Sequence, residues 1–323
     1  MDRRSFITGT TAAAAFAAMP GASAQSWPSR SLRMISAYTP GNSSDTVLRL
    51  VAAPMQAALG QPVVVDNRPG ASGNIGAQAC KAATPDGYTF LMATNTMLTA
   101  NPHLFTAGRV DPFEDLSFVQ PMVNIGMVFV VRPDSPWKTT GELLDDARRH
   151  PGKLSYGTPG VGSPMHLIGE LLKDRAGIDM AHLPYKGGMP MVSDVIAGQV
   201  SVGIVGYAVV AGLLQQGRLK TLAAAAGKRL SILPEVPAIG EIVPEAALGA
   251  WCALVAPKGT PDPIRARVAR EAAAALALPE VVKKLQPVGL DQIAGDEATV
   301  AALVRSESAH VGALIKRLGI TMS

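Results

Sequence analysis

Short apolar segments alternate with amphipathic ones along this chain, and that alternation limits the folds that it can adopt. In the first part, the pattern predicts strands at residues 32–38, 62–66 and 88–93, a helix over 45–59 and a second helix ending about residue 83. Val47, Leu48 and Val51 have the spacing of one helical face. Strands that alternate with helices at such short intervals predict a parallel sheet with helices on its faces, an α/β fold.

The alternation starts again after the long apolar segment Val123–Val131 and ends before a second one, Trp251–Ala256. Between them we predict helices over 140–149, 163–176, 190–197 and 209–216 and strands over 154–157, 182–184, 200–205 and 221–225. Helices over 263–276, 279–286 and 296–318 follow. A chain that builds one α/β unit, crosses to a second and returns has two lobes joined by two strands. Ligands bind between such lobes, which close about a hinge.

The first residues have the order of an export signal. Arg3 and Arg4 precede an uncharged stretch from Ile7 to Met19, and Ala22-Ser23-Ala24 provides the small residues that a signal peptidase needs. The paired arginines indicate the twin-arginine route, with cleavage near Ala24. An ordinary N-terminal helix is the alternative. Without residues 1–24, 299 of the 323 residues remain, enough for two domains of about 150 residues each.

The composition excludes several classes of protein. Only 17% of the residues are charged, the net charge is +4, and no basic run interleaves with aromatic residues, so we expect no nucleic-acid partner. After residue 24, no stretch approaches the ~18 apolar residues of a membrane span. Cys80 and Cys252 lie far apart in the sequence, and we interpret them as buried free thiols rather than a disulfide.

Three predicted strand-to-helix turns share glycine, proline and small hydroxyl residues, at positions 38–44, 156–163 and 184–190. Ser43 or Ser44 and Ser163 are candidates to cap the following helices. The free amides at a helix N-terminus attract an anion by about 0.3–1 kcal/mol each. Asp45 falls in a first helical turn and is a candidate brace for its loop. Each turn also has a plainer interpretation, as a connector in an α/β fold.

Other motifs are weak. Gly70, Gly73 and Gly76 have the wrong spacing for a dinucleotide fingerprint, and we assign them to backbone packing. Ser163 lies three residues from His166, which leaves an exported serine hydrolase as an alternative function, although no G-x-S-x-G motif surrounds it. The five histidines have no metal-binding spacing. We therefore expect no cofactor and no metal.

At these residues the chain resembles the Bug family, the TctC-like substrate-binding receptors of tripartite tricarboxylate transporters. The segments that carry the resemblance are 40–45 (P-G-N-S-S-D, where the family has P-G-G-x-x-D), 67–73 (N-R-P-G-A-S-G), 85–89, 156–163, 184–187, 234–237 and 256–261. The resemblance implies a type II periplasmic binding protein of the Venus-flytrap kind. Such receptors hold a carboxylate between the loops at 38–45 and 158–163 and deliver it to a membrane carrier of large and small subunits.

Two departures from the family pattern concern the ligand. Asn42 replaces the second glycine of the first motif, and Ser201 together with Val205-Gly206-Tyr207 stands where the family usually has acidic residues. The loss of these acids argues against a ligand with an amino group and leaves an aromatic or plain aliphatic acid.

We therefore predict an exported, monomeric solute receptor for a small organic carboxylate, without catalysis. The first lobe is expected at residues 25–124 and 250–323, and the second at 125–249. A signalling receptor that presents its liganded form to a sensor domain is a further alternative. The expected ligand-binding residues, with Asp45 as a brace, are Tyr38, Thr39, Gly41, Asn42, Ser43, Asp45, Asn95, Thr158, Gly162, Ser163 and Tyr207.

Overall fold

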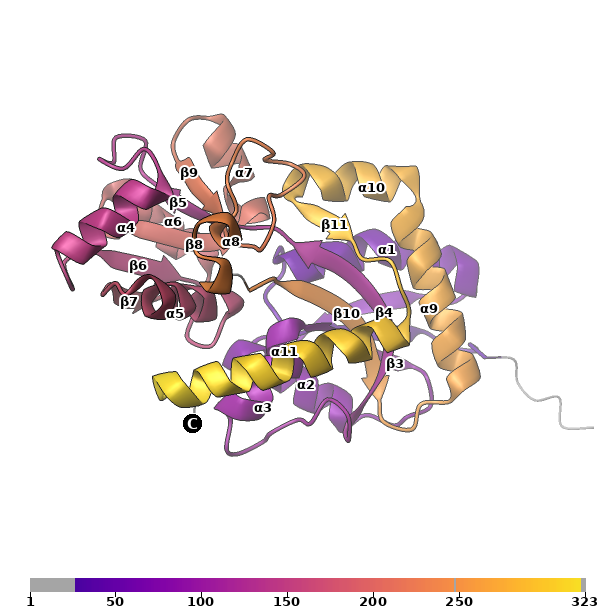
Figure 1. Cartoon of the computed structure of the whole chain (residues 1–323). Coiled ribbons are helices and arrows are strands. Elements are labelled where there is room, and N and C mark those ends of the chain that lie inside the picture. The colour runs from indigo at the N-terminus through magenta and orange to yellow at the C-terminus, as the bar shows by residue number, and fades with distance from the viewer. Residues whose placement is uncertain (1–26, 247, 321–323) are drawn as a thin grey trace, which may run out of the picture.

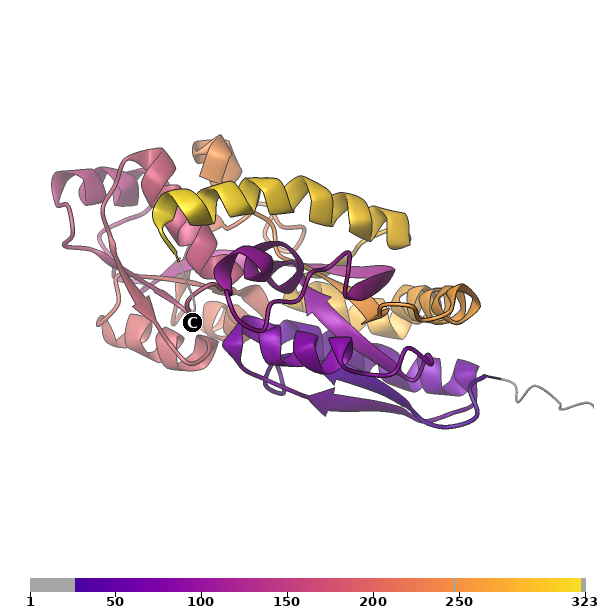
Figure 2. The same ribbon diagram turned by 90° about the horizontal axis from the view of Figure 1, so that it is seen from below.

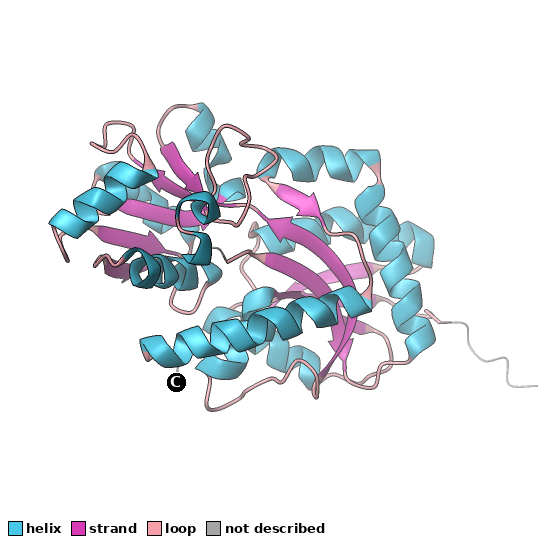
Figure 3. Cartoon of the chain, in the orientation of Figure 1, coloured by secondary structure: helices cyan, strands magenta, loops and turns pink. Residues whose placement is uncertain are grey.

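Two β-sheets, each with helices on both faces, organise the chain (Figures 1 and 3). The structure is a computed structural model that describes residues 27–246 and 248–320. The expected export signal at residues 1–24 lies outside the described residues. Among the described helices, none has both the length and the apolar character that a membrane span requires.

The first sheet has six strands in the order β11-β4-β10-β3-β1-β2. Its strands are β1 (Leu32–Ser36), β2 (Val63–Asn67), β3 (Thr89–Thr94), β4 (Leu116–Ile125), β10 (Trp251–Pro257) and β11 (Leu290–Gln292). As predicted, β1 pairs in parallel with β2 and β3. β4 leads out of this sheet and β10 leads back into it, so these two strands lie antiparallel side by side. The part of the chain built on this sheet is called the first lobe below.

The second sheet has five strands in the order β7-β6-β8-β5-β9, and it defines the second lobe. Its strands are β5 (Met127–Val131), β6 (Ser155–Thr158), β7 (Ala181–Pro184), β8 (Val202–Gly206) and β9 (Lys220–Ala224). β6 is parallel to β7 and β8, whereas β5 runs antiparallel to β8 and β9. The two-lobed α/β prediction is therefore confirmed.

Each face of the first sheet has its own apolar core, because neighbouring side chains of a strand point to opposite faces. Met34 of β1 packs in one core and Ile35 in the other. Residues of α1 (Ser43–Leu59), α9 (Asp262–Ala277) and α10 (Pro279–Leu285) join the core of Met34. Residues of α2 (Asn74–Lys81) and α11 (Glu297–Leu318) join the core of Ile35.

The second sheet repeats this arrangement. Phe129 of β5 packs in one core and Val130 in the other. The core of Phe129 includes residues of α4 (Thr140–Arg149) and α5 (Pro164–Ala176). The core of Val130 includes residues of α6 (Gly188–Ala197) and α7 (Tyr207–Gln215).

Helix ends follow the capping residues, with one correction. Asn42, rather than Ser43 or Ser44, caps α1, since its side-chain oxygen accepts a hydrogen bond from the amide of Ser44 at 3.1 Å. Ser163 caps α5 as predicted, and Gly60 ends α1 in the left-handed conformation. The asparagine that departs from the family pattern thus has a structural role at the start of α1.

Several short elements lie outside the predicted pattern. The region after β3 forms a π-helical turn, η2 (Thr96–Ala100), and then α3 (Asn101–Leu104), and the first half of β4 was also not predicted. The other short helices are η1 (Ala71–Gly73), α8 (Ile239–Ile242), η3 (Pro244–Ala246) and η4 (Gln286–Val288). The close packing predicted for the glycine-rich segment is present: a Cβ on Gly76 would lie 2.6 Å from the Cβ of Ala37.

The chain leaves the first sheet within the predicted segment 123–131, although this crossing is not one strand. The return precedes the predicted segment, because all of β10 pairs in the first sheet. Gly126 separates β4 from β5, its amide donates to the carbonyl of Gly289 at 2.7 Å, and its carbonyl accepts from the amide of Tyr207 at 2.8 Å. A Cβ at this position would lie 2.9 Å from the Gly289 oxygen. The crossing therefore passes between segments of both lobes, where only glycine fits without adjustment.

The C-terminal helix α11 contacts both lobes (Figures 1 and 2). Val300 and Val304 pack in a core of the first sheet, whereas Leu314 joins a cluster that contains residues of η2 and α3 as well as residues of α5 in the second lobe. Arg317 forms an ion pair with Asp174 of α5 at 2.7 Å. α11 is therefore a third connection between the lobes, beside the two crossings.

The cysteine prediction is also confirmed. Cys80 and Cys252 are both buried free thiols, and burial raises the pKa of each to about 12. Neither is poised to react as a thiolate at neutral pH.

Candidate functional site

The candidate site lies where the carboxyl-terminal edges of the two sheets face each other. In the first lobe, β1 leads to α1 and β2 leads to η1 and α2, and in the second lobe β6 leads to α5 and β8 leads to α7. Two contacts show that these edges meet. Ser72 Oγ of η1 donates to the carbonyl of Val161 at 2.9 Å, and Ser43 Oγ lies 3.7 Å from the position of a Cβ on Gly206. Open α/β sheets bind ligands beyond such strand ends.

In the first lobe, residues 38–45 form a tight loop that presents the N-terminus of α1. Asn42 is exposed and caps the helix, while Ser43 is buried and faces the second lobe. Within the described part of the chain, the amides of Ser43 and Asp45 have no hydrogen-bond acceptor. The loop therefore offers the second lobe a hydroxyl and two amides that are free to donate.

Asp45 fixes the shape of this loop from behind. Its Oδ2 accepts from the amide of Gly41 and from Arg49 Nε, both at 2.9 Å, and its Oδ1 accepts from Asn67 Nδ2 at 2.8 Å. Asn67 Nδ2 also donates to the carbonyl of Tyr38. Burial disfavours the ionised carboxyl, but the hydrogen bonds from Arg49, Gly41 and Asn67 outweigh it and hold the pKa of Asp45 below its ordinary value. The carboxylate is thus occupied by the protein itself.

Tyr38 and Thr39 occupy different positions in the loop. The hydroxyl of Tyr38 lies 3.1 Å from Thr94 Oγ1 at the end of β3, and burial raises the pKa of this phenol. Thr39 is exposed, and its carbonyl accepts from the amide of Asn42. Gly41 adopts φ +84°, which requires glycine, and its amide is the one that Asp45 holds.

In the second lobe, the loop between β6 and α5, residues 158–163, mirrors the first. Ser163 Oγ donates to the carbonyl of Gly160 at 2.7 Å and accepts from the amide of His166 at 3.3 Å. The amide of Gly162 donates to His166 Nδ1 at 3.1 Å. Thr158 is fully buried, and its Oγ1 lies 2.8 Å from His182 Nε2. Several predicted ligand donors of this loop therefore already have partners, which shape the loop.

Two predicted ligand-binding residues are engaged elsewhere. Asn95 Nδ2 donates to the carbonyl of Gly249 at 2.9 Å and to Glu307 Oε2 at 3.3 Å, which ties the end of β3 to the second crossing and to α11. The ring of Tyr207 is buried at the start of α7, and a Cβ on Gly289 would lie 3.1 Å from Tyr207 Cδ1. Asn95 is thus held by the second crossing and α11, and Tyr207 lies against Gly289, whose carbonyl accepts from Gly126 at the first crossing.

Sequence reasoning missed Ser72, whose hydroxyl bonds directly to the second-lobe loop at Val161. Ala71 and Ser72 have φ values of 47° and 50°, the left-handed region that non-glycine residues seldom adopt. Asn101 Nδ2 donates to the carbonyl of Ser72 at 3.1 Å and helps to hold this conformation. Strained backbone of this kind gathers at ligand-binding loops. The motif at residues 67–73 contains Ser72, but its contacts with Val161 and Asn101 are distant in sequence and could not be predicted from it.

The facing loops carry no lysine or arginine at residues 38–45 or 156–163. Lys186, in the loop between β7 and α6, is exposed. Attraction of an anion between the lobes would thus come from helix N-termini and hydroxyls. Among the described residues, no group of three or more histidine, cysteine, aspartate or glutamate side chains could hold a metal ion.

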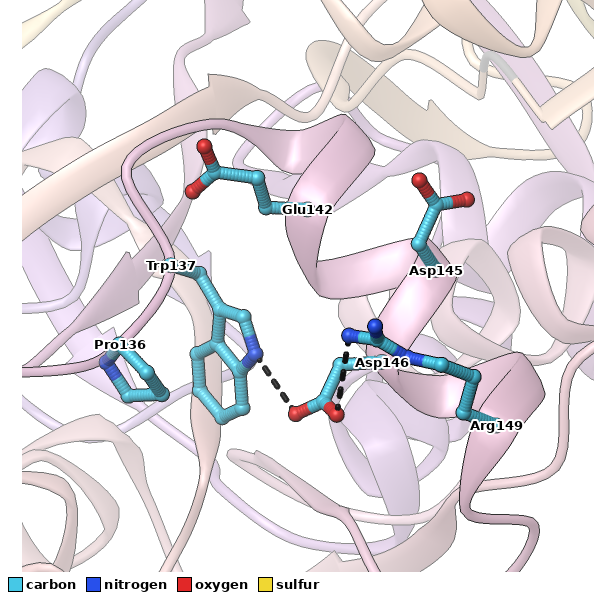
Figure 4. Close-up of a pocket in the computed structure, with 6 residues that line it drawn as sticks. All are labelled: Pro136, Trp137, Glu142, Asp145, Asp146 and Arg149. Atoms are coloured by element: carbon cyan, nitrogen blue, oxygen red, sulfur yellow. Dashed lines mark hydrogen bonds and ion pairs between the residues drawn. The ribbon is translucent and has the colours of Figure 1, made fainter.

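A cavity of about 340 Å³ lies elsewhere, on the second lobe beside α4 (Figure 4). It is lined by Pro136, Trp137, Glu142, Asp145, Asp146 and Arg149. Trp137 Nε1 donates to Asp146 Oδ2 at 2.9 Å, and the bonds from Trp137 and His150 lower the pKa of Asp146. None of the predicted ligand-binding residues lines this cavity, and its central carboxylate is already paired.

Solved structures of the same fold resemble the chain over nearly its whole length. One is an R. palustris protein with adipate, 32% identical, with a TM-score of 0.83, covering 91% of this chain and 99% of that one. Another is MatC from Rhodopseudomonas palustris with bound malate, 27% identical, with a TM-score of 0.81, covering 90% of this chain and 100% of that one. The periplasmic binding protein BugD is 27% identical, with a TM-score of 0.82, and covers 92% and 100%.

The sequence comparisons agree with the fold. A UPF0065 protein of Bordetella bronchiseptica is 34% identical over 302 residues, which covers 94% of this chain and 90% of that protein. The model of the family described as the tripartite tricarboxylate transporter family receptor, TctC, matches residues 47–320. This chain is a member of that family of solute-binding receptors.

Proposed function

We propose that this protein captures a small organic carboxylate between its two lobes and delivers it to a tripartite tricarboxylate-type carrier. The observation that carries the proposal is the pair of facing loops at residues 38–45 and 158–163, which present helix N-termini from separate sheets and have no cationic side chain. Donors of this kind suit a carboxylate. The relatives solved with adipate and malate support the same ligand class.

The energetics are adequate for capture. Each helix N-terminus contributes about 0.3–1 kcal/mol to the binding of an anion, and more where the site is partly buried. Hydroxyl donors such as Ser43 and apolar contacts would add to this, and about −8 kcal/mol corresponds to micromolar affinity. Closure of the lobes would remove water from the charge and strengthen each of these contacts.

The ligand class can be narrowed further. Gly206, which faces Ser43 across the lobes, and its neighbour Tyr207 stand where related receptors were expected to carry acids. An ammonium group buried there would have no carboxylate partner, and an unpaired buried charge is costly. We infer an aliphatic or aromatic acid without an amino group.

Ser163 and His166 support binding rather than hydrolysis. The Ser163 hydroxyl donates to the carbonyl of Gly160, while His166 Nδ1 accepts from the amide of Gly162. A nucleophile and its base would have to bond to each other. We infer a receptor without catalysis.

The remaining parts of the proposal concern location and partners. We infer export by the signal at residues 1–24, a periplasmic monomer, and contact with the membrane carrier subunits. We place the first lobe at residues 25–124 and 250–323 and the second at 125–249. The interruption of the strands at Gly126, between β4 and β5, supports a boundary near residue 125.

Calorimetric titration with a panel of mono- and dicarboxylates tests the function. The panel pairs succinate with aspartate and adipate with 2-aminoadipate, because each pair differs only in the amino group. We expect a micromolar binder among the plain acids and a loss of at least about tenfold for its amino partner. Ser43→Ala should weaken binding by about ten- to a hundredfold, because a hydrogen bond to a charged group contributes about 1.5–3 kcal/mol. Ser306→Ala on the exposed face of α11 is the matched control.

Two results would contradict the proposal. The first is a panel in which no carboxylate binds, and the second is hydrolysis of ester substrates that disappears in Ser163→Ala. Equal affinity for an acid and its amino partner would refute only the narrower ligand class.

A further inference from the structure

Three aromatic rings stack behind the loop at residues 158–163. His166 of α5 lies on His182 of β7, with ring centroids 4.1 Å apart and planes at 22°. His182 in turn lies on Tyr156 of β6 at 4.8 Å and 25°. We call these three rings the imidazole stack. Its members come from three consecutive elements of the second lobe, so the stack fixes where α5 begins relative to the sheet.

Each histidine of the stack contacts one end of the loop. His166 Nδ1 accepts the hydrogen bond of the Gly162 amide at 3.1 Å, and His182 Nε2 lies 2.8 Å from Thr158 Oγ1. The bond to Gly162 requires an unprotonated Nδ1, because a protonated ring nitrogen cannot accept. The shape of the loop is therefore linked to the charge of the rings.

The surroundings favour neutral rings. Burial lowers the pKa of His166, and burial together with His166 lowers the pKa of His182 to about 4. Two other charged groups act on the stack, Glu170 and Lys173 of α5. Glu170 accepts from the Tyr156 hydroxyl at 2.5 Å and from Lys173 Nζ at 3.0 Å, so its charge is already paired. At neutral pH the hydrogen bond to Gly162 is therefore intact.

We propose that His166 and His182 are positioning residues of the ligand site, which hold the loop in its binding shape while His166 is neutral and release it when that ring is protonated. This rests on the proposed function, because the loop is the second-lobe half of the carboxylate site. Protonation of His166 removes the acceptor of the Gly162 amide, which then has no partner in the loop. If the loop is in its binding shape only part of the time, the apparent affinity falls by that fraction. Acidic pH would thus lower the affinity of the receptor for its ligand and favour release.

The first test uses the protein without ligand. We expect the Gly162 amide to exchange its hydrogen faster in His166→Leu than in the wild type. His166→Asn should retain slow exchange, because its side-chain oxygen can take the place of Nδ1 and cannot be protonated near neutral pH. His310→Leu, on the exposed surface of α11, is the control for loss of a histidine. Wild-type exchange at Gly162 in His166→Leu would overturn the proposal.

The second test measures affinity for adipate against pH. At pH 7.5, His166→Leu should bind about tenfold more weakly, a loss of one buried hydrogen bond, while His166→Asn binds nearly as the wild type does. Between pH 7.5 and 5, the wild type should lose more affinity than His166→Asn, whose loss reflects only protonation of the acid. A purely structural role would give both proteins the same pH profile, and that result would overturn the switch. If the wild type binds neither adipate nor any other acid of the panel, the result counts against the proposed function, while Gly162 exchange still decides the role of His166.

Discussion

Replacement of Asp45 by asparagine tests the idea that a carboxylate holds the first-lobe loop. The substitution keeps the size of the side chain and removes its charge. Oδ2 faces two donors, the amide of Gly41 and Arg49 Nε, and Oδ1 faces a third, Asn67 Nδ2. An amide NH2 group placed at either position therefore meets a donor. The variant cannot satisfy all three donors in either orientation.

The expected cost follows from these contacts. Loss of a hydrogen bond to a charged group, with a buried donor left unpaired, costs about 1.5–3 kcal/mol. The ion pair with Arg49 contributes less to the free energy of unfolding, because the side chain of Arg49 is 50% exposed and water screens the charge. We expect Asp45→Asn to lower the free energy of unfolding by about 2 kcal/mol in urea at pH 7 and to weaken ligand binding through the released loop. Asp262→Asn, which removes an 88% exposed partner of Arg265, is the matched control and should cost less than about 1 kcal/mol.

The dependence on pH gives an independent check. The pKa of Asp45 is lower in the folded protein than its ordinary value, so its contribution is complete above that ordinary value. It is lost as the pH falls through the lowered folded pKa. The difference between wild type and Asp45→Asn should therefore shrink in acid. A variant as stable as the wild type at pH 7, or a difference that does not depend on pH, would refute this account of the loop.

Three other perturbations follow from the structure. Gly126→Ala should destabilise the protein by about 1–3 kcal/mol in thermal unfolding, since the added Cβ would lie 2.9 Å from the Gly289 oxygen; unchanged stability would contradict the close crossing. Ser72→Ala should weaken carboxylate binding several-fold with little change in melting temperature, because it removes only the hydrogen bond to Val161 between the lobes; equal affinity by calorimetry would argue against that role. The pKa of His182 is lowered to about 4, so the free energy of unfolding should decrease as the pH falls from about 6.5 towards 4. In His182→Gln, urea unfolding at several pH values should show a smaller decrease over this range.

Much of the fold could be predicted because its signals are local. The helix predicted over 140–149 is found at Thr140–Arg149, where Thr139 caps its start, and the parallel pairing of β1 with β2 follows from strand–helix alternation. The break at Gly126 was not predicted, because the apolar residues on both sides of Asn124 and Gly126 indicated a single strand over 123–131. Only their pairing with different sheets separates β4 from β5.

The candidate site also has a part that could be predicted from the sequence and a part that could not. The turn chemistry of residues 38–45 and 156–163 indicated which loops begin helices, and both do. The partners of individual side chains could not be predicted, since they are distant in sequence. Asn95 bonds to Gly249, 154 residues away, and His182 reaches Thr158 only through the pairing of β6 with β7. Asn42 shows the opposite case, in which an unusual residue has an ordinary local explanation as a helix cap.

The course of α11 has a mechanical consequence. Its first turns pack on one lobe, and its last turns, through Leu314 and Arg317, pack on the other. Any rotation of one lobe against the other must then roll or shear this last part of the helix. A fluorophore near the end of α11 should therefore change its signal when the lobes rotate, although it lies far from the ligand loops. A bulky protein fused after α11 should slow this rotation, which the two crossings between the sheets do not hinder.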